Sequence, residues 1–188
     1  SVTAKERIAE LGADMTVISG EEYSLEYSPM HILALGTPQE IDRKFIAKAI
    51  LETAEAKELK TSLGDLSCDA DAYTATQLLL DEVRRIGGVS VLAHPLWKPI
   101  SPNGWRMDTP ESLFLELAKD KRFDGVEIVS GSRPGEYSTS GMQAALSRQM
   151  LGDCYDIPII GITDSHRYST DPICGKHFTI IFSKDRTQ

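Results

Sequence analysis

Apolar and polar residues follow each other along the chain in blocks that predict a succession of short strands and helices. Apolar runs of strand length occupy residues 15–22, 31–36, 89–95, 124–130, 157–166 and 176–184. Apolar residues at helical spacing predict helices near residues 3–12, 41–50, 74–88, 111–120 and 141–151. Strands that alternate with helices favour an α/β fold, here in the order α-β-β-α-α-β-α-β-α-β-β.

Capping residues indicate where some of these helices begin and end. Thr3 and Glu6 fit a capping box at the start of the first helix, and Gly12 follows its last apolar residue. Thr109 and Pro110 are suited to the N-cap and first position of the helix that follows them. No repeat, low-complexity segment or linker interrupts the pattern, so we expect all 188 residues to form a single domain.

The composition is that of a soluble globular protein, with 41% hydrophobic and 26% charged residues. The formal net charge of −8 and the lack of basic runs disfavour broad binding to the phosphates of nucleic acids. No apolar run reaches the length of a membrane span, and the first residues lack the pattern of a signal peptide. We therefore expect a cytoplasmic protein without a membrane partner. The three cysteines have no CxxC spacing and are expected to be reduced thiols.

Residues able to bind a metal ion gather at the ends of four predicted strands. These residues are Glu21 and Glu22, His31, His94, and Asp164 with His166. In parallel α/β sheets and barrels, the carboxyl ends of the strands converge on one rim, where active sites are built. His31 begins its strand rather than ending it, but an antiparallel return from the strand of Glu22 would place it at the same rim.

Three histidines and two carboxylates at one rim suit a divalent transition metal, because imidazole favours zinc, iron or manganese over calcium or magnesium. Each residue also has a structural alternative, since His94 precedes a proline, Asp164 is able to cap a turn and Glu22 is suited to solvent. For each residue taken alone, the structural interpretation is at least as well supported as metal binding. Together, three of the four histidines at equivalent strand ends favour a metal site. The fourth, His177, lies in a strand-like stretch and is interpreted as a packing or surface residue.

The order of these motifs resembles the PHP (polymerase and histidinol phosphatase) family of metal-dependent phosphoesterases. "VISGEEYS" is similar to the G-x-E strand end of the family, "MHILALG" to its next histidine strand, "GGVSVLAHP" to its A-H-P motif and "GITDSH" to its final D-x-H motif. The likeness covers essentially the whole chain. It implies a distorted (β/α)7 TIM-like barrel with a centre of two or three zinc, manganese or iron ions at its rim.

The resemblance also implies roles for single residues. Glu22 would bridge two ions, His31 and His94 would bind one of them, Asp164 the other, and His166 a third ion. A metal-activated hydroxide would attack phosphorus while the ions neutralise the charge that develops on the phosphoryl oxygens. Asp164 and His166 are accordingly expected to be catalytic as well as metal-binding residues.

The sequence departs from the family at its start. The H-x-H motif of the first strand and a further histidine motif are absent, so the chain resembles a later part of the domain without its first one or two β-α units. The ion shared by Glu22 and Asp164 would then be weakly held. We expect an N-terminal segment that this sequence does not contain, and the alternative is a naturally short, inactive form.

Arginines near these motifs are expected to bind the substrate, because a guanidinium group presents two parallel donors that match a phosphate. Arg133 follows the predicted strand 124–130, and Arg167 follows the D-x-H motif directly. For each of them a solvated surface charge is an equal alternative. The partner expected at this site is a small phosphorylated molecule.

Two classes of function remain open from the sequence. The first is a phosphoesterase that hydrolyses a small phosphorylated metabolite or nucleotide. The second is a non-catalytic PHP-like domain that serves structure or binding, which the missing histidine motifs favour if 188 residues are the natural chain. A PHP-type nuclease or proofreading module also fits the family, but the acidic charge balance disfavours it.

Overall fold

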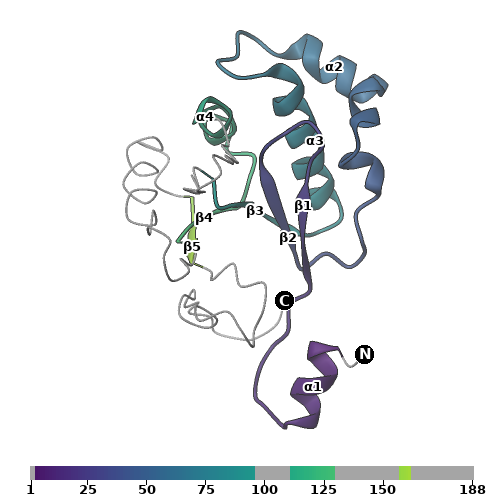
Figure 1. Cartoon of the computed structure of the whole chain (residues 1–188), viewed down its shortest axis with the longest axis vertical. Coiled ribbons are helices and arrows are strands. Elements are labelled where there is room, and N and C mark those ends of the chain that lie inside the picture. Colours follow the sequence, from purple (N-terminus) through teal and green to yellow (C-terminus); the bar gives the residue numbers. More distant parts are fainter. Residues whose placement is uncertain (1–2, 96–110, 130–156, 162–188) are drawn as a thin grey trace, which may run out of the picture.

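A mixed β-sheet of five strands forms the centre of the structure, a computed structural model that describes residues 3–95, 111–129 and 157–161 (Figure 1). The strands lie side by side in chain order, and they are β1 (Gly20–Ser24), β2 (His31–Leu35), β3 (Val89–Ala93), β4 (Gly125–Val129) and β5 (Ile159–Gly161). The pairs β1–β2 and β2–β3 are antiparallel, whereas β3–β4 and β4–β5 are parallel. The antiparallel return that was expected to bring His31 to the rim is confirmed.

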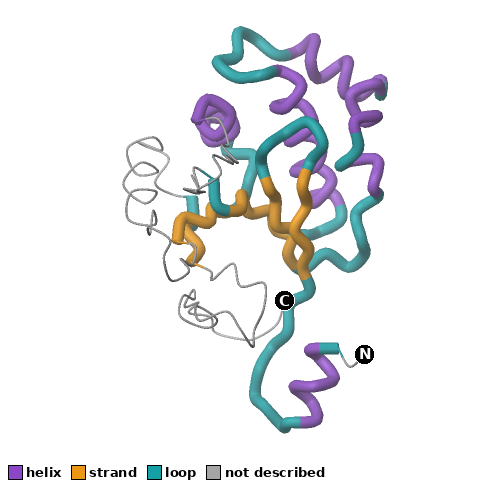
Figure 2. Tube along the Cα trace, in the orientation of Figure 1, coloured by secondary structure: helices purple, strands orange, loops and turns teal. Residues whose placement is uncertain are grey.

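Apart from the first helix, the helices lie on one side of this sheet (Figure 2). The helical elements are α1 (Ala4–Glu10), the 3-10 helices η1 (Arg43–Phe45) and η2 (Lys48–Glu52), α2 (Ala54–Ser62), α3 (Ala70–Arg85) and α4 (Glu111–Lys119). Helix α3 contacts strand β3, and both α2 and α4 contact α3. The α/β class expected from the sequence is therefore confirmed for the described residues.

Helix α3 is central to the core because its sequence combines a capped start with a long apolar surface. The side chain of its N-cap, Asp69, accepts a hydrogen bond from the backbone N–H of Ala72 at 2.8 Å. Two arginines in the last turn interact favourably with the helix dipole, and Gly87 follows in a left-handed conformation, with a φ of 84°. The buried core formed by this helix and the sheet includes Leu79, Leu80, Val83, Ile32, Ala34, Leu92 and Val126.

The first helix lies apart from the sheet, at the end of a long connection (Figure 1). Its expected capping box is confirmed, because the hydroxyl of Thr3 accepts the backbone N–H of Glu6 at 3.2 Å. The carboxylate of Glu6 in turn accepts the backbone N–H of Thr3 at 2.7 Å. Gly12 adopts a φ of 61°, as expected for a glycine that follows the end of a helix.

The strand expected over residues 15–22 is wrong in its first part, because β1 begins at Gly20. Gly20 pairs with Leu35, the last residue of β2, so the described part of the chain holds no neighbouring strand for residues 15–19. The side chains of Met15 and Ile18 in this segment are exposed. Their apolar character resembles that of a strand, but strand pairing ends where β2 ends.

The continuous helix expected over residues 41–50 is also wrong, and two short 3-10 helices replace it. Ala47 between them is extended, with φ and ψ of −84° and 153°. Glu26 bonds to the backbone on both sides of this break, since its N–H donates to the carbonyl of Ile46 at 3.0 Å and its carboxylate accepts the N–H of Lys48 at 2.6 Å. A residue distant in sequence thus binds backbone groups that a continuous helix would use internally.

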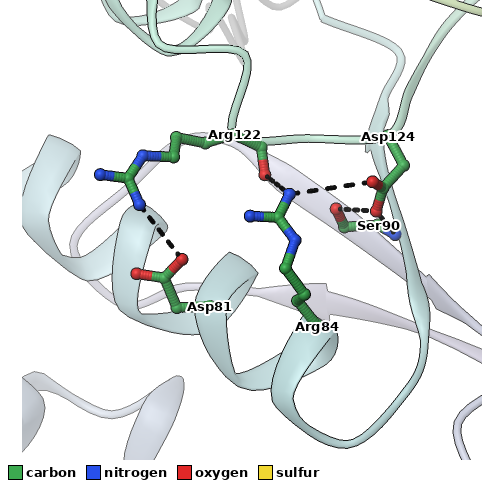
Figure 3. A network of polar contacts seen from close by, with 5 residues as sticks. All are labelled: Asp81, Arg84, Ser90, Arg122 and Asp124. Atoms are coloured by element: carbon green, nitrogen blue, oxygen red, sulfur yellow. Dashed lines mark hydrogen bonds and ion pairs between the residues drawn. The ribbon is translucent and has the colours of Figure 1, made fainter.

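A polar network joins α3 to the amino-terminal ends of β3 and β4 (Figure 3). Arg84 donates to the backbone carbonyl of Arg122 at 3.0 Å and lies 3.8 Å from the carboxylate of Asp124. Asp124 in turn accepts hydrogen bonds from Ser90 in β3. A guanidinium nitrogen of Arg122 also lies 3.5 Å from Asp81 on α3. The network fixes β3 and β4 relative to α3 at the end opposite His94, which follows the last residue of β3.

The described strands form an open arc, and the closed (β/α)7 barrel implied by the resemblance stays a prediction. The strand expected at 176–184 and the helix expected at 141–151 lie outside the described residues, as do Thr109 and Pro110. The strand expected over 157–166 is described as far as β5. Among the described residues, no helix combines the length and the apolar character needed to cross a bilayer.

Candidate metal centre

Glu22 lies in the middle of β1 on the face of the sheet that points away from α3. Neighbouring residues of a strand point to opposite faces, and Tyr23 is buried in the core that α3 shares with the sheet. Glu21 lies on the same face as Tyr23, whose hydroxyl donates to the Glu21 carboxylate at 2.8 Å. Of the two adjacent glutamates in the sequence, strand alternation therefore leaves Glu22 on the face away from α3.

His31, the first residue of β2, lies with Glu22 on the face of the sheet that points away from α3. Glu22 pairs with Leu33 across the two strands, which makes His31 its diagonal neighbour. Diagonal neighbours are within reach of long side chains, and Nδ1 of His31 lies 2.8 Å from Oε1 of Glu22. The antiparallel pairing of β1 and β2 is thus sufficient to bring these two residues together.

His94 reaches the same carboxylate through a departure from regular strand geometry. Ala93, the last residue of β3, pairs with His31 and so shares its face, which would place the next residue on the helix side. Instead, His94 adopts a φ of 28°, in the left-handed region that residues other than glycine rarely occupy. Its Nε2 lies 3.3 Å from Oε1 of Glu22. Such a conformation costs about 1–3 kcal/mol and persists only where the surroundings enforce it.

The three side chains form a compact and partly exposed cluster. The two imidazole rings meet edge to face, with centroids 5.0 Å apart and an interplanar angle of 74°. Their side chains are 19% and 11% exposed for His31 and His94, whereas that of Glu22 is 36% exposed. Hydrogen bonds from His31 and then His94 hold the pKa of the Glu22 carboxyl far below its usual range, outweighing the burial that raises it. Glu22 is consequently a carboxylate with one oxygen shared by two imidazoles.

This donor set fits a divalent transition metal ion. One carboxylate oxygen and one nitrogen from each imidazole all lie within 4.8 Å of one another. Two ligand atoms that each lie about 2.0–2.1 Å from a tetrahedral ion are separated by about 3.3 Å, which falls within this limit. Two imidazoles and one carboxylate also form a known catalytic zinc set, in which the fourth position stays open to water or substrate. These three residues could therefore hold one ion and leave room for a ligand.

Glu127 in β4 is a further residue of this site that was not selected from the sequence. Its side chain is fully buried, and its Oε2 accepts the backbone N–H of His94 at 3.1 Å. The register of β3 and β4 places Glu127 on the same face of the sheet as Ala93. A single charged residue inside the apolar run "GVEIV" is the sequence feature that could have identified it, because carboxylates are rarely buried without a partner.

The other residues expected at the site are not among those the structure describes. Asp164 and His166, expected to bind further ions, lie outside the described residues, as do Arg133 and Arg167, expected to bind phosphate. The structure thus brings together three of the five expected metal ligands and leaves the other two untested.

A separate cavity of about 510 Å³ lies among the helices, lined by residues of η1, α2 and α3. Its lining is largely acidic and includes Glu40, Asp42 and Asp81. None of the three clustered metal-binding residues lines it. The candidate site is therefore the face of the sheet that points away from α3 rather than this cavity.

Comparisons with known proteins add a structural likeness to this description. No family model matches the chain, and no curated protein matches it. Among solved structures, the chain is similar to a two-domain protein from Bacteroides vulgatus ATCC 8482 that contains a predicted PHP-like metal-dependent phosphoesterase. The two share 18% sequence identity with a TM-score of 0.43, over 86% of this chain. The chain spans only 35% of the length of that protein's chain.

Proposed function

We propose that this protein is a metal-dependent phosphoesterase that hydrolyses a small phosphorylated metabolite or nucleotide. The observation that carries the proposal is that the imidazoles of His31 and His94 converge on one carboxylate oxygen of Glu22. These residues come from three separate segments of the chain, and each stands where the sequence resembles a PHP motif. A chance meeting of three such residues would have no reason to follow that order of motifs.

In this proposal Glu22, His31 and His94 hold one divalent transition metal ion, either zinc, manganese or iron. Asp164 and His166 belong to the same centre and bind the further ions of a two- or three-ion site. When bound, such ions supply Lewis acidity, which activates water and neutralises charge on phosphoryl oxygens. The chain's own residues position this chemistry, because Glu22 is a carboxylate at neutral pH and presents one shared oxygen to both imidazoles.

Around the cluster, buried apolar residues of the sheet adjoin side chains that are partly exposed. Val91 and Ala93 of β3 lie on the same face of the sheet as His31, and they are 0% and 2% exposed. Glu22 is the most exposed of the three clustered side chains. We propose that Arg133 and Arg167 bind the phosphate of the substrate, and that residues 1–188 belong to a single PHP-like domain, the later part of a distorted barrel without its first one or two β-α units.

Metal content and hydrolysis of a generic aryl phosphate test this function directly. The purified protein is loaded with Zn²⁺, Mn²⁺ or Co²⁺, dialysed and assayed for bound metal and for release of the aryl alcohol. His94→Ala is expected to lower metal affinity by at least about 100-fold, since removal even of an outer partner of a ligand costs 10- to 100-fold. His177→Ala removes the one histidine that has no assigned role and serves as the matched control.

The outcomes separate the enzyme from a binding domain. Bound metal and hydrolysis in the wild-type protein, both lost in His94→Ala and kept in His177→Ala, support the phosphoesterase. Bound metal without hydrolysis of any phosphate ester would favour a non-catalytic metal-binding domain. If the wild-type protein retains no transition metal, the proposed metal-dependent function is overturned.

A further inference from the structure

Glu127 is a buried carboxylate that serves one identified hydrogen bond at the candidate site. It is 0% exposed in the middle of β4, between apolar residues of the strand. Its Oε2 accepts the backbone N–H of His94 at 3.1 Å. Burial of an ionised carboxylate is unfavourable unless its oxygens are satisfied, so the hydrogen bond from His94 helps to offset the burial of Glu127.

The role of Glu127 is indicated by the position of His94 relative to β3. Regular alternation after Ala93 would direct the imidazole of His94 to the helix side of the sheet, away from Glu22. The left-handed backbone of His94, with a φ of 28°, departs from that alternation, and Nε2 of its ring lies 3.3 Å from Glu22. The backbone N–H that Glu127 accepts belongs to the residue in this unusual conformation.

We propose that Glu127 is a positioning residue, whose carboxylate holds the backbone of His94 in the conformation that directs its ring into the metal centre; the proposal rests on the metal-binding function proposed above. A hydrogen bond from an N–H to a carboxylate is stronger than one between neutral groups, which suits it to hold a strained backbone. Partners of this kind orient a metal ligand without binding the ion themselves.

The geometry distinguishes this role from that of a ligand. Among the described residues, the group of ligand atoms that lie within 4.8 Å of one another comes from Glu22, His31 and His94 alone. Glu127 shares their face of the sheet but contacts the group through the main chain of His94. In this proposal its effect on a bound ion is exerted through the orientation of the His94 imidazole.

Two variants of Glu127 and one control separate positioning from general stability. Glu127→Leu removes the acceptor, whereas Glu127→Gln keeps a carbonyl oxygen of similar reach. Val126→Ala alters the adjacent buried residue of the same strand, which points to the helix side and is in the core. All proteins are titrated with Co²⁺ and followed by the visible absorption of the bound ion. The metal-free proteins are also examined by NMR for the hydrogen exchange rate of the His94 amide.

The expected result is a loss of Co²⁺ affinity of about 10- to 100-fold in Glu127→Leu, the usual effect of removing an outer partner of a ligand. Glu127→Gln is expected to recover most of this loss, and Val126→Ala to leave Co²⁺ affinity unchanged even though it lowers stability. In the metal-free proteins the His94 amide exchanges faster in Glu127→Leu than in the wild type.

Equal exchange of the His94 amide in wild type and Glu127→Leu overturns the positioning role, whatever the metal affinity. Equal Co²⁺ affinity in these two proteins overturns it as well. Failure of the metal-binding function is recognised separately, because then the wild-type protein itself binds no Co²⁺. Even in that case, the amide exchange of the metal-free proteins decides whether Glu127 holds the backbone of His94.

Discussion

Asp124 accepts two hydrogen bonds from Ser90, one from its backbone N–H and one from its hydroxyl, each at 2.9 Å. The backbone N–H of Asp124 donates in return to the carbonyl of Ser90 at 2.9 Å. Ser90 is buried in β3, and Asp124 directly precedes β4. This reciprocal pair sets the position of β4 relative to β3, and therefore the alignment that later brings Glu127 beside His94.

Replacement of Asp124 by alanine is expected to lower the free energy of unfolding by about 1–3 kcal/mol. The substitution removes two hydrogen bonds to a carboxylate and leaves the buried N–H of Ser90 without that acceptor. Urea denaturation of wild type and Asp124→Ala, followed by circular dichroism, measures the difference.

Asp81→Ala is the matched control from the same network. Asp81 makes a single contact at 3.5 Å with Arg122, and both side chains are exposed by more than 40%. A surface pair of this kind contributes less than about 1 kcal/mol. Equal destabilisation by Asp81→Ala and Asp124→Ala would contradict the special role of the Ser90 contact.

Metal binding is expected to stabilise the folded protein, and Glu22 is the residue on which this stabilisation depends most. An ion that binds only the folded state stabilises it by about 2.7 kcal/mol when its free concentration is 100 times Kd. Since Glu22 contacts both imidazoles, Glu22→Gln is expected to abolish the increase of Tm on addition of Zn²⁺ or Co²⁺. Thermal unfolding with and without the ion measures this effect, and a chelator should reverse it.

Glu21→Gln provides a close control for that experiment, because Glu21 is the adjacent residue on the opposite face and contacts Tyr23 instead. The increase of Tm with metal should persist in this variant. If Glu21→Gln and Glu22→Gln lose the increase alike, the ion binds through exposed acidic residues in general, and the cluster around Glu22 is not its site.

The sequence predicted the pair of Glu22 and His31 better than it predicted the place of His94. Alternation along β1 and β2, with antiparallel pairing, is sufficient to place the first two residues on one face. His94 could be assigned only by its motif, because the same alternation directs it to the wrong side of the sheet. The left-handed backbone that corrects this is a tertiary feature that involves Glu127, a residue 33 positions away.

The failure of the helix predicted over 41–50 has a similar cause. Its apolar residues do face the core at helical spacing, and Ile41, Phe45 and Ile50 are buried as expected. However, Glu26 binds the backbone of Ile46 and Lys48 and divides the segment. Periodicity reports which residues are buried, but it does not report hydrogen bonds between the segment and a residue distant in sequence, which divide the backbone here.

Glu116 is expected to make the stability of the protein depend on pH in the acidic range. Its carboxylate joins α4 to the segment before α3, since it accepts the N–H and hydroxyl of Ser67 and the ammonium of Lys119. The hydrogen bond from Lys119 and then those from Ser67 lower the pKa of Glu116 from its ordinary value of 4.5. The stabilisation is therefore fully present above pH 4.5 and is lost as the pH falls through the lowered pKa of the folded state.

The measurement is the free energy of unfolding in urea over a series of pH values, for wild type and Glu116→Gln. The wild type should be the more stable of the two at neutral pH, and the difference should shrink as the solution is acidified. A difference that stays constant with pH, or grows in acid, would show that the charge of Glu116 contributes nothing to this contact.

Gly88 is expected to tolerate no side chain, because the chain passes between α3 and the end of β2 at this point. A Cβ atom at Gly88 would lie 2.6 Å from Cγ2 of Thr37 and 3.1 Å from Cγ1 of Val83, with the backbone oxygen of Leu35 at 3.3 Å. Val83 is buried and Thr37 is stiff because it branches at Cβ, so neither moves without shifting its surroundings. Gly88→Ala should therefore destabilise the fold by about 1–3 kcal/mol, the range for overpacking.

Gly64→Ala is the control, since no atom lies within 4 Å of a Cβ there. Its free energy of unfolding is expected to be unchanged or higher by up to about 1 kcal/mol. Urea unfolding of the two variants side by side tests the difference, and equal stability of both would refute the close packing of Gly88.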